Sequence, residues 1–267
     1  MTRVDQPIPR RYRSLATESG LLAGRLLTCW LRAPAITIQA VVFPTFLLIT
    51  YKLLIGKSIL RITGTDSVYS LGPMCAVAGA MFGSLAAAMS VRAERENGLL
   101  SRLWILPINR ASVLTGRLLA DAIRTLLSSV LISCVGLLLG LRFSGGVLAT
   151  LIFLLVPVLM GGVFSTAVLA IATRARTGTA MLWLGVPSIG AVFSSSGVPP
   201  ISLLPEWFQP LVRHQPMAPT INCMRELALG GNWAGPLTET IAWALVLAAV
   251  LLPLAITGYR SAAASRH

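Results

Sequence analysis

The chain has 267 residues, of which 55% are hydrophobic and only 12% are charged, and its mean hydropathy is +0.78. Soluble domains carry about 25% charged residues, so this composition excludes an ordinary soluble domain and indicates an integral membrane protein. A net charge of +13 is also found in nucleic-acid-binding proteins, but here the basic residues flank apolar segments, which argues against a nucleic-acid partner.

The N-terminal segment alternates basic and apolar residues. Between residues 11 and 32, leucines share one side of a helix, while Glu18, Arg25 and Arg32 recur every seven residues on another side. This pattern predicts an amphipathic helix at the cytoplasmic membrane face. We expect the chain to turn into the first span at Ala33-Pro34, because proline suits the first turn of a helix.

Apolar runs long enough to cross a hydrocarbon core of about 30 Å follow along the chain. They predict six transmembrane helices, over residues 33–54, 68–91, 114–141, 147–172, 179–198 and 240–258. The predicted fold is an all-α integral membrane protein with a single transmembrane domain over residues 1–267. Residues 1–32 form a cytoplasmic tail and interfacial helix, residues 33–258 the six-helix membrane part, and residues 259–267 a second cytoplasmic tail.

The basic residues are distributed unevenly about these spans. With both termini in the cytoplasm, fifteen Lys and Arg residues lie on the inner side and six on the outer side, while Arg124 lies within the third span. The positive-inside rule therefore predicts a multi-pass cell-membrane protein with cytoplasmic termini. Lys52, Lys57 and Arg61, after the first predicted span, are exceptions.

Small residues dominate the second predicted span, where Gly79 and Gly83 are four positions apart. Such spacing lets helices approach closely. We interpret it as packing within the chain, with a subunit interface as the alternative.

The densest charge in the chain lies between the second and third spans, at residues 92–110. Glu94 and Glu96 alternate with arginines, Gly98 follows them, and Pro107 ends the short segment beyond. This arrangement predicts a polar connection that leads into a short helix.

Within that short helix, Leu99, Leu103 and Trp104 fall on one arc. A short helix that has one apolar side and follows the acidic residues Glu94 and Glu96 is predicted to insert into a groove of a partner protein. A helix lying on the lipid surface is the alternative.

The third predicted span contains Asp121 and Arg124, three residues apart, so the two can pair along one helix face. Pairing lowers the cost of placing charges in a membrane. We interpret them as a neutralised pair near the inner end of the span, facing a neighbouring helix. A part in a substrate path or in a transmission link is the alternative.

The outer segment at residues 199–239 contains seven prolines but is too apolar for a solvated loop. We predict short helices at the membrane surface, forming a helical outer hairpin between spans five and six. The candidate site residues of this outer hairpin are Pro205, Trp207, Pro216 and Arg225.

Catalytic signatures are weak. Gly56-Lys57-Ser58 resembles the end of a phosphate-binding loop, but Tyr51 occupies the position where that loop needs a glycine. His214 and His267 are the only histidines, and neither has Cys, Asp or Glu at ligand spacing. The chain is therefore predicted to be no enzyme and to bind no cofactor or metal of its own.

Two motifs resemble ABC-2 type transporter permeases. The first is Glu94-Arg-Glu-Asn-Gly-Leu-Leu-Ser-Arg-Leu-Trp-Ile-Leu-Pro-Ile-Asn-Arg110, at the position of the family's charged cytoplasmic loop. The second lies between spans five and six, is similar to the daunorubicin/doxorubicin-resistance branch, and comprises Leu204-Pro-Glu-Trp-Phe-Gln-Pro210, His214-Gln-Pro216 and Met224-Arg-Glu-Leu227. The resemblance covers nearly the whole chain.

The resemblance implies an exporter permease that pairs with an identical or related permease in the lipid bilayer. Two ATPase subunits, which hold ATP and Mg, bind from the cytoplasm. The implied ATPase-docking residues are Glu94, Glu96, Gly98, Leu99, Leu103 and Pro107, with Trp104 in the same helix. Asn97 and Trp104 depart from the commoner family pattern. The implied substrate is an amphipathic antibiotic or a cell-envelope lipid.

Two other classes of membrane protein are alternatives, and each needs residues of which the chain has few. An ion-driven secondary transporter needs several acidic groups within its spans, whereas Asp121 is alone there and has Arg124 beside it. A membrane-embedded lipid transferase needs His or paired carboxylates at a membrane face, and the only candidates lie in the outer loop.

Overall fold

The computed structural model describes residues 14–32, 34–97, 110–174, 179–195 and 205–264. All regular structure within these ranges is helical, so the predicted all-α class is confirmed for them. The helices are α1 (Leu15–Arg32), α2 (Pro34–Thr63), α3 (Val68–Glu96), α5 (Arg110–Leu138), α6 (Gly146–Ala172), α7 (Thr179–Ser194), α8 (Gln209–Arg213), α9 (Met217–Leu229) and α10 (Ala234–Ala264).

Five of these helices are long and apolar enough to cross a membrane. The candidate spans are Val42–Ile62, Val68–Val91, Ala111–Leu138, Gly146–Ala172 and Ala234–Gly258. The predicted fifth span corresponds to α7, which has only 16 described residues, whereas a membrane crossing takes about 20. The described part of the chain therefore holds five candidate spans and one shorter apolar helix.

The predicted end of the first span was wrong. Instead of stopping at residue 54, α2 continues to Thr63, so Lys52, Lys57 and Arg61 are helical. Apolar residues separate these charges, and the lysine stems can lie along the helix surface while their charged ends reach polar surroundings. The fragment Gly56-Lys57-Ser58 therefore belongs to a helix and not to a phosphate-binding loop.

The predicted start of the last span was also wrong, because α10 begins at Ala234 and not at residue 240. Pro236 lies in its first turn, where proline is tolerated because the N–H groups there have no partner within the helix. Glu239, assigned to the outer loop by the sequence pattern, is thus an exposed residue of this helix.

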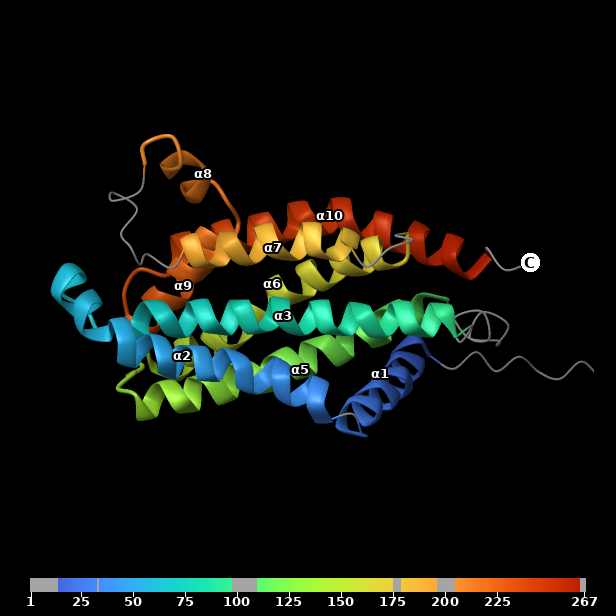
Figure 1. Cartoon of the computed structure of the whole chain (residues 1–267), viewed down its shortest axis with the longest axis horizontal. Helices are drawn as coiled ribbons and strands as arrows, with labels where there is room; N and C mark the ends of the chain where they lie inside the picture. Colours follow the sequence, from blue (N-terminus) through green and yellow to red (C-terminus); the bar gives the residue numbers. More distant parts are fainter. Residues whose placement is uncertain (1–13, 33, 98–109, 175–178, 196–204, 265–267) are drawn as a thin grey trace, which may run out of the picture.

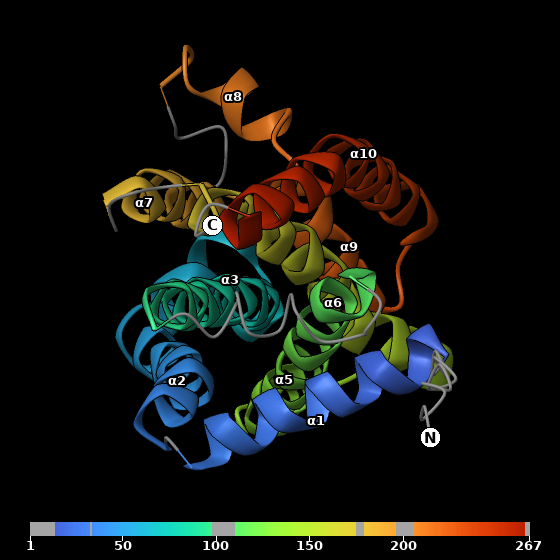
Figure 2. The ribbon, with the colours of Figure 1, turned by 90° about the vertical axis from the view of Figure 1, so that its right-hand side faces the viewer.

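The long helices lie side by side, with α3 between α2 and α6 (Figures 1 and 2). In the most apolar 18-residue stretch of α3, 65% is buried inside the structure, whereas the corresponding figure for α10 is 17%. Helix α3 is therefore central and α10 is peripheral. The core between α3 and α6 includes Met81, Phe153 and Met160. This arrangement brings α3, α5 and α6 together along the middle of the bundle.

Helix α1 crosses one end of the bundle against α5 (Figure 2). The hydroxyls of Ser19 and Thr115 are 2.6 Å apart and share a hydrogen bond. A Cβ on Gly116 would lie 2.9 Å from Leu22 Cβ, so the glycine permits this close crossing. One face of α1 is therefore covered by α5.

Candidate functional site: a buried charge cluster on α5

Three charged residues of α5 lie on one helix face. Arg117, Asp121 and Arg124 are spaced by four and then three residues, which places them in a row. Their side chains are 10%, 7% and 8% exposed, respectively. We call these three residues the α5 charge ladder.

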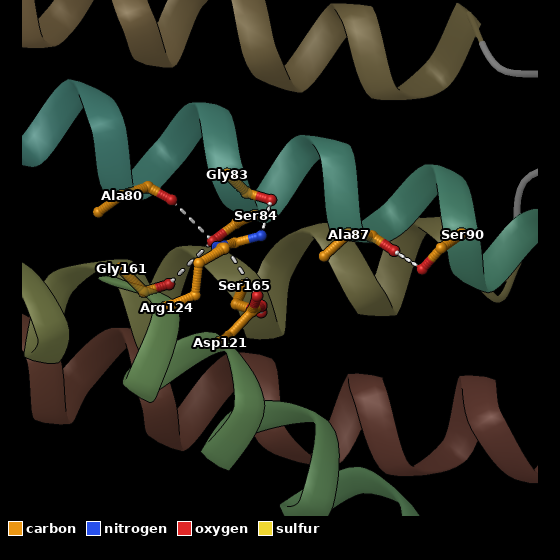
Figure 3. Close-up of polar contacts among 9 residues, drawn as sticks. All are labelled: Ala80, Gly83, Ser84, Ala87, Ser90, Asp121, Arg124, Gly161 and Ser165. Carbon is orange, nitrogen blue, oxygen red and sulfur yellow. Dashed lines mark hydrogen bonds and ion pairs between the residues drawn. The ribbon is translucent and has the colours of Figure 1, made fainter. Parts of the chain in front are cut away.

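The structure brings Asp121 and Arg124 together and joins them to two further helices (Figure 3). Arg124 Nη2 lies 2.7 Å from Asp121 Oδ1. Ser165 of α6 donates a hydrogen bond to Asp121 Oδ2, and Arg124 Nη1 donates to the carbonyl oxygen of Gly83 in α3. The pair thus joins α3, α5 and α6, which is more than the single neighbouring helix expected.

The pair lies in the middle part of α5. Arg124 is the central residue of α5, which runs from Arg110 to Leu138. Among the described candidate spans, Asp121 is the only buried acidic side chain. Charges at such a position are stable only when they are paired and hydrogen-bonded, as these two are.

The Arg124 guanidinium is enclosed on two sides. Its Cζ lies 5.1 Å from the centroid of the Trp30 ring of α1, a cation–π distance. On the other side, a Cβ on Gly83 would lie 2.6 Å from Arg124 Cζ. The missing side chain at Gly83 is therefore what lets the arginine reach the carbonyl oxygen, a role that the glycine spacing alone does not indicate.

Gly79 and Gly161 serve helix packing. A Cβ on Gly79 would lie 2.9 Å from Pro44 Cγ of α2, which agrees with the predicted close approach of helices within the chain. A Cβ on Gly161 would lie 2.9 Å from Ala80 Cβ, so α6 and α3 also meet closely. These two glycines therefore let α3 lie close to α2 and to α6.

The ladder ends at the base of the 92–110 loop. Arg117 Nη2 donates to Glu94 Oε2 on the last turns of α3, and the Glu94 side chain is 18% exposed. Glu94, expected to contact an ATPase, thus has an ionic partner within the chain. Its pairing residue is 23 positions away, so no local sequence pattern indicates the contact.

The remaining docking residues are not placed. Glu96 is the last residue of α3, and its side chain lies outside the described part of the chain. The other predicted contacts also lie outside the described residues; they are Gly98, Leu99, Leu103, Trp104 and Pro107.

A cavity of about 20 Å³ lies beside the ladder. Its polar lining is Ser84, Arg117, Asp121 and Ser165, and its apolar lining comes from α1, α3 and α6. This volume holds about one water molecule. Small-molecule sites are roughly 300–1,000 Å³, so the cavity is too small for an amphipathic substrate in this conformation.

A second ion pair lies at the opposite end of α3. Lys52 of α2 pairs with Asp66, whose Oδ1 also accepts a hydrogen bond of 3.1 Å from the Val68 N–H at the start of α3. Burial raises the pKa of Asp66, but the hydrogen bond and charge of Lys52 and the Val68 N–H together outweigh it and hold the pKa below its usual range. The two side chains are 22% and 38% exposed.

The four residues of the predicted outer hairpin do not form one site. Pro205 and Trp207 are exposed beside α8, which stands away from the bundle (Figure 1). Pro216 precedes α9, and Arg225 within α9 donates a 2.6 Å hydrogen bond to Asn222.

Gln215 connects this hairpin to the bundle. Its Nε2 lies 3.1 Å from the Ala191 carbonyl oxygen and 3.2 Å from Ser194 Oγ, both on α7. Gln215 belongs to the His214-Gln-Pro216 motif, but the motif does not indicate these contacts, because the partners of Gln215 lie more than 20 positions away.

Apolar spans packed around a buried, partnered charge cluster define a multi-pass helical membrane protein. Residues 17–229 match the ABC-2 type transporter family, so the chain belongs to that family. The resemblance expected from the two motifs is confirmed.

Two relatives show the branch of the family. The chain is 35% identical over 251 residues to the "Probable doxorubicin resistance ABC transporter permease protein DrrC" of Mycobacterium tuberculosis, covering 94% of this chain and 91% of that protein. It is 27% identical to the "Daunorubicin resistance ABC transporter permease protein DrrB1" of Streptomyces coeruleorubidus, covering 89% and 84%. The chain is thus similar to drug-resistance permeases over most of its length.

Proposed function

We propose that this chain is the membrane subunit of an ABC exporter that moves an amphipathic substrate out of the cell with ATP hydrolysed on a separate subunit. The observation that carries this proposal is the family match over residues 17–229, together with relatives named as drug-resistance permeases. Those names favour an antibiotic as substrate, and a cell-envelope lipid is the second candidate.

The proposed topology has six spans, one transmembrane domain over residues 1–267 and both termini in the cytoplasm. α7 supplies the core of the fifth span. α1 lies at the inner membrane surface, which is supported by its two faces: Ala23 and Leu26 are buried, whereas Leu21 and Arg25 are exposed. A helix with this distribution suits a membrane interface.

The proposed complex contains this chain, a second identical or related permease, and two ATPase subunits that hold ATP and Mg²⁺. The ATPase binds the 92–110 loop through Glu96, Leu103 and Trp104, with Gly98, Leu99 and Pro107 shaping the segment. Glu94 lies at the base of the loop, where its pairing with Arg117 positions the loop without a direct contact to the ATPase.

Ion-driven transport is less well supported. Asp121, the buried acid in the described spans, already has Arg124 and Ser165 as partners, so an ion or proton would have to displace them.

Docking is tested by co-expressing the chain with an ABC ATPase subunit from the same genome. The double variant Glu96→Ala/Leu103→Ala is expected to lose co-purification with the ATPase and ATP-dependent uptake of daunorubicin into inverted vesicles. The matched control is Glu206→Ala/Leu211→Ala, which removes the same groups from exposed positions of the predicted outer hairpin.

Unchanged co-purification and transport in the loop variant would contradict the docking assignment. Uptake that an ionophore abolishes while ATP is present would instead establish the ion-driven alternative.

A further inference from the structure

We propose that Arg117 exchanges partners during transport, pairing with Glu94 in the described conformation and with Asp121 when the ATPase displaces the loop. Arg117 is then a positioning residue that carries loop movement into the bundle. This inference rests on the proposed function, because it needs an ATPase acting on the 92–110 loop.

The first step is the contact between loop and ladder. Glu94 lies on the last turns of α3, at the base of the loop, and its ion pair with Arg117 is largely buried. Ion pairs shielded from water interact more strongly than exposed ones. A displacement of this end of α3 therefore either moves α5 or breaks the Glu94–Arg117 pair.

The second step is the position of Asp121 between two arginines. Arg117 precedes it by four residues and Arg124 follows it by three, so both can reach the carboxylate along one helix face. A buried arginine that loses its partner is costly. Asp121 offers Arg117 a second partner one helical turn away, about 6 Å along the helix.

The third step is the space for this movement. The cavity of about 20 Å³ is lined by both Arg117 and Asp121, and also by Ser84, Ala87 and Ser165. The cavity holds about one water molecule, so the guanidinium of Arg117 needs the displacement of α3 as well as this space to reach Asp121.

The last step is the effect on the bundle. Asp121 now holds Arg124 and Ser165, and Arg124 holds the Gly83 carbonyl oxygen. If Arg117 draws the carboxylate toward itself, these contacts to α3 and α6 weaken. Loop movement thereby changes how α3, α5 and α6 are held together, which is what a substrate path between helices requires.

The discriminating variant is the charge swap Glu94→Arg/Arg117→Glu. It preserves an ion pair between α3 and α5, but it puts a carboxylate beside Asp121, so the exchange cannot occur. We expect the swapped chain to remain monodisperse and to co-purify with the ATPase. Transport should fall roughly tenfold, within the usual range of coupling between sites.

Arg117→Lys, which can serve both partners, should keep most of the transport. Arg25→Ala is the matched control, since it removes a positive charge from the exposed face of α1.

Full transport by the swapped chain would overturn the proposal, because the Glu94–Arg117 pair would then be only structural. Loss of co-purification in the swapped chain would also overturn it and make Glu94 a direct ATPase contact. Failure of the unmodified chain to bind any ATPase is a different result, which refutes the proposed function itself.

A second variant keeps the test independent of changes in charge. Ala87→Val fills the cavity beside the ladder and should reduce transport about fivefold while ATPase binding is retained. Its control is Ala86→Val, the preceding residue of α3, which does not line the cavity. Equal transport by the two valine variants would overturn the proposal.

Discussion

The two ion pairs Asp121–Arg124 and Lys52–Asp66 differ mainly in burial. The former is 7% and 8% exposed and is joined by hydrogen bonds to α3 and α6, whereas the latter is 22% and 38% exposed at the other end of α3. Water can replace a lost partner at the exposed pair but not at the buried one. Loss of one partner should therefore change the free energy of unfolding little at the exposed pair and strongly at the buried pair.

The largest expected effect comes from Asp121→Ala, which leaves Arg124 buried without its carboxylate. We expect a loss of about 3–5 kcal/mol in the free energy of unfolding, because an unpaired buried charge is strongly destabilising. The measurement is unfolding of the purified chain in mixed detergent micelles. The double variant Asp121→Leu/Arg124→Met should recover much of the loss, and no recovery would mean that the pair is not what Asp121→Ala disrupts.

Gly83→Ala should have the next largest effect. Its Cβ would overlap the Arg124 guanidinium and displace it from the carbonyl oxygen, at a cost of about 1–3 kcal/mol. Gly72→Ala is the control on the same helix, because nothing lies within 4 Å of a Cβ there. Equal unfolding curves for the two variants would show that Arg124 does not depend on the space at Gly83.

Asp66→Asn tests the exposed pair, and its effect should stay within about 1 kcal/mol. The pKa of Asp66 is lower in the folded chain than its unfolded value of about 3.9, so the carboxylate contributes stability above that pH and loses it as the pH falls through the folded pKa. The difference in melting temperature between variant and unmodified chain should therefore be present at pH 6 and shrink as the pH falls below about 3.9 and through the folded pKa. A difference that persists in acid would contradict this account.

Trp207→Ala should have the smallest effect, within about 0.5 kcal/mol, because the side chain is 77% exposed on the predicted outer hairpin. Gln215→Ala, which removes the contacts to α7, should cost more. A larger loss for Trp207→Ala in the assembled complex than in the isolated chain would place Trp207 against the second permease.

Local pattern predicted the central helices well. α3 begins at Val68, the predicted first residue, and α6 differs from prediction by one residue at its start, because long apolar runs determine where helices form in a membrane protein. The end of α2 was missed because Lys52 resembles a helix end in the sequence, whereas its charge is met by Asp66 in the fold.

The candidate site could be predicted only in part. Asp121 and Arg124 are three residues apart, so their pairing follows from helix geometry. Glu94 and Arg117 lie in different helices, so their pairing does not follow from helix geometry. Gly79 and Gly83 belong to one small-residue motif, yet Gly79 faces Pro44 of a neighbouring helix, whereas Gly83 makes room for the side chain of Arg124. Those roles depend on which helices become neighbours, and a single sequence does not specify that.

The charge ladder also has a consequence for biogenesis. An arginine or an aspartate at the centre of a helix costs about 2.5–3.5 kcal/mol on insertion by the translocon. Gly83 precedes α5 in the chain and can meet Arg124 as α5 enters the membrane, but Ser165 arrives only with α6. The charges of α5 therefore gain their partners one after the other as the chain is synthesised. A chain released before α6 is made leaves Asp121 without the hydroxyl of Ser165.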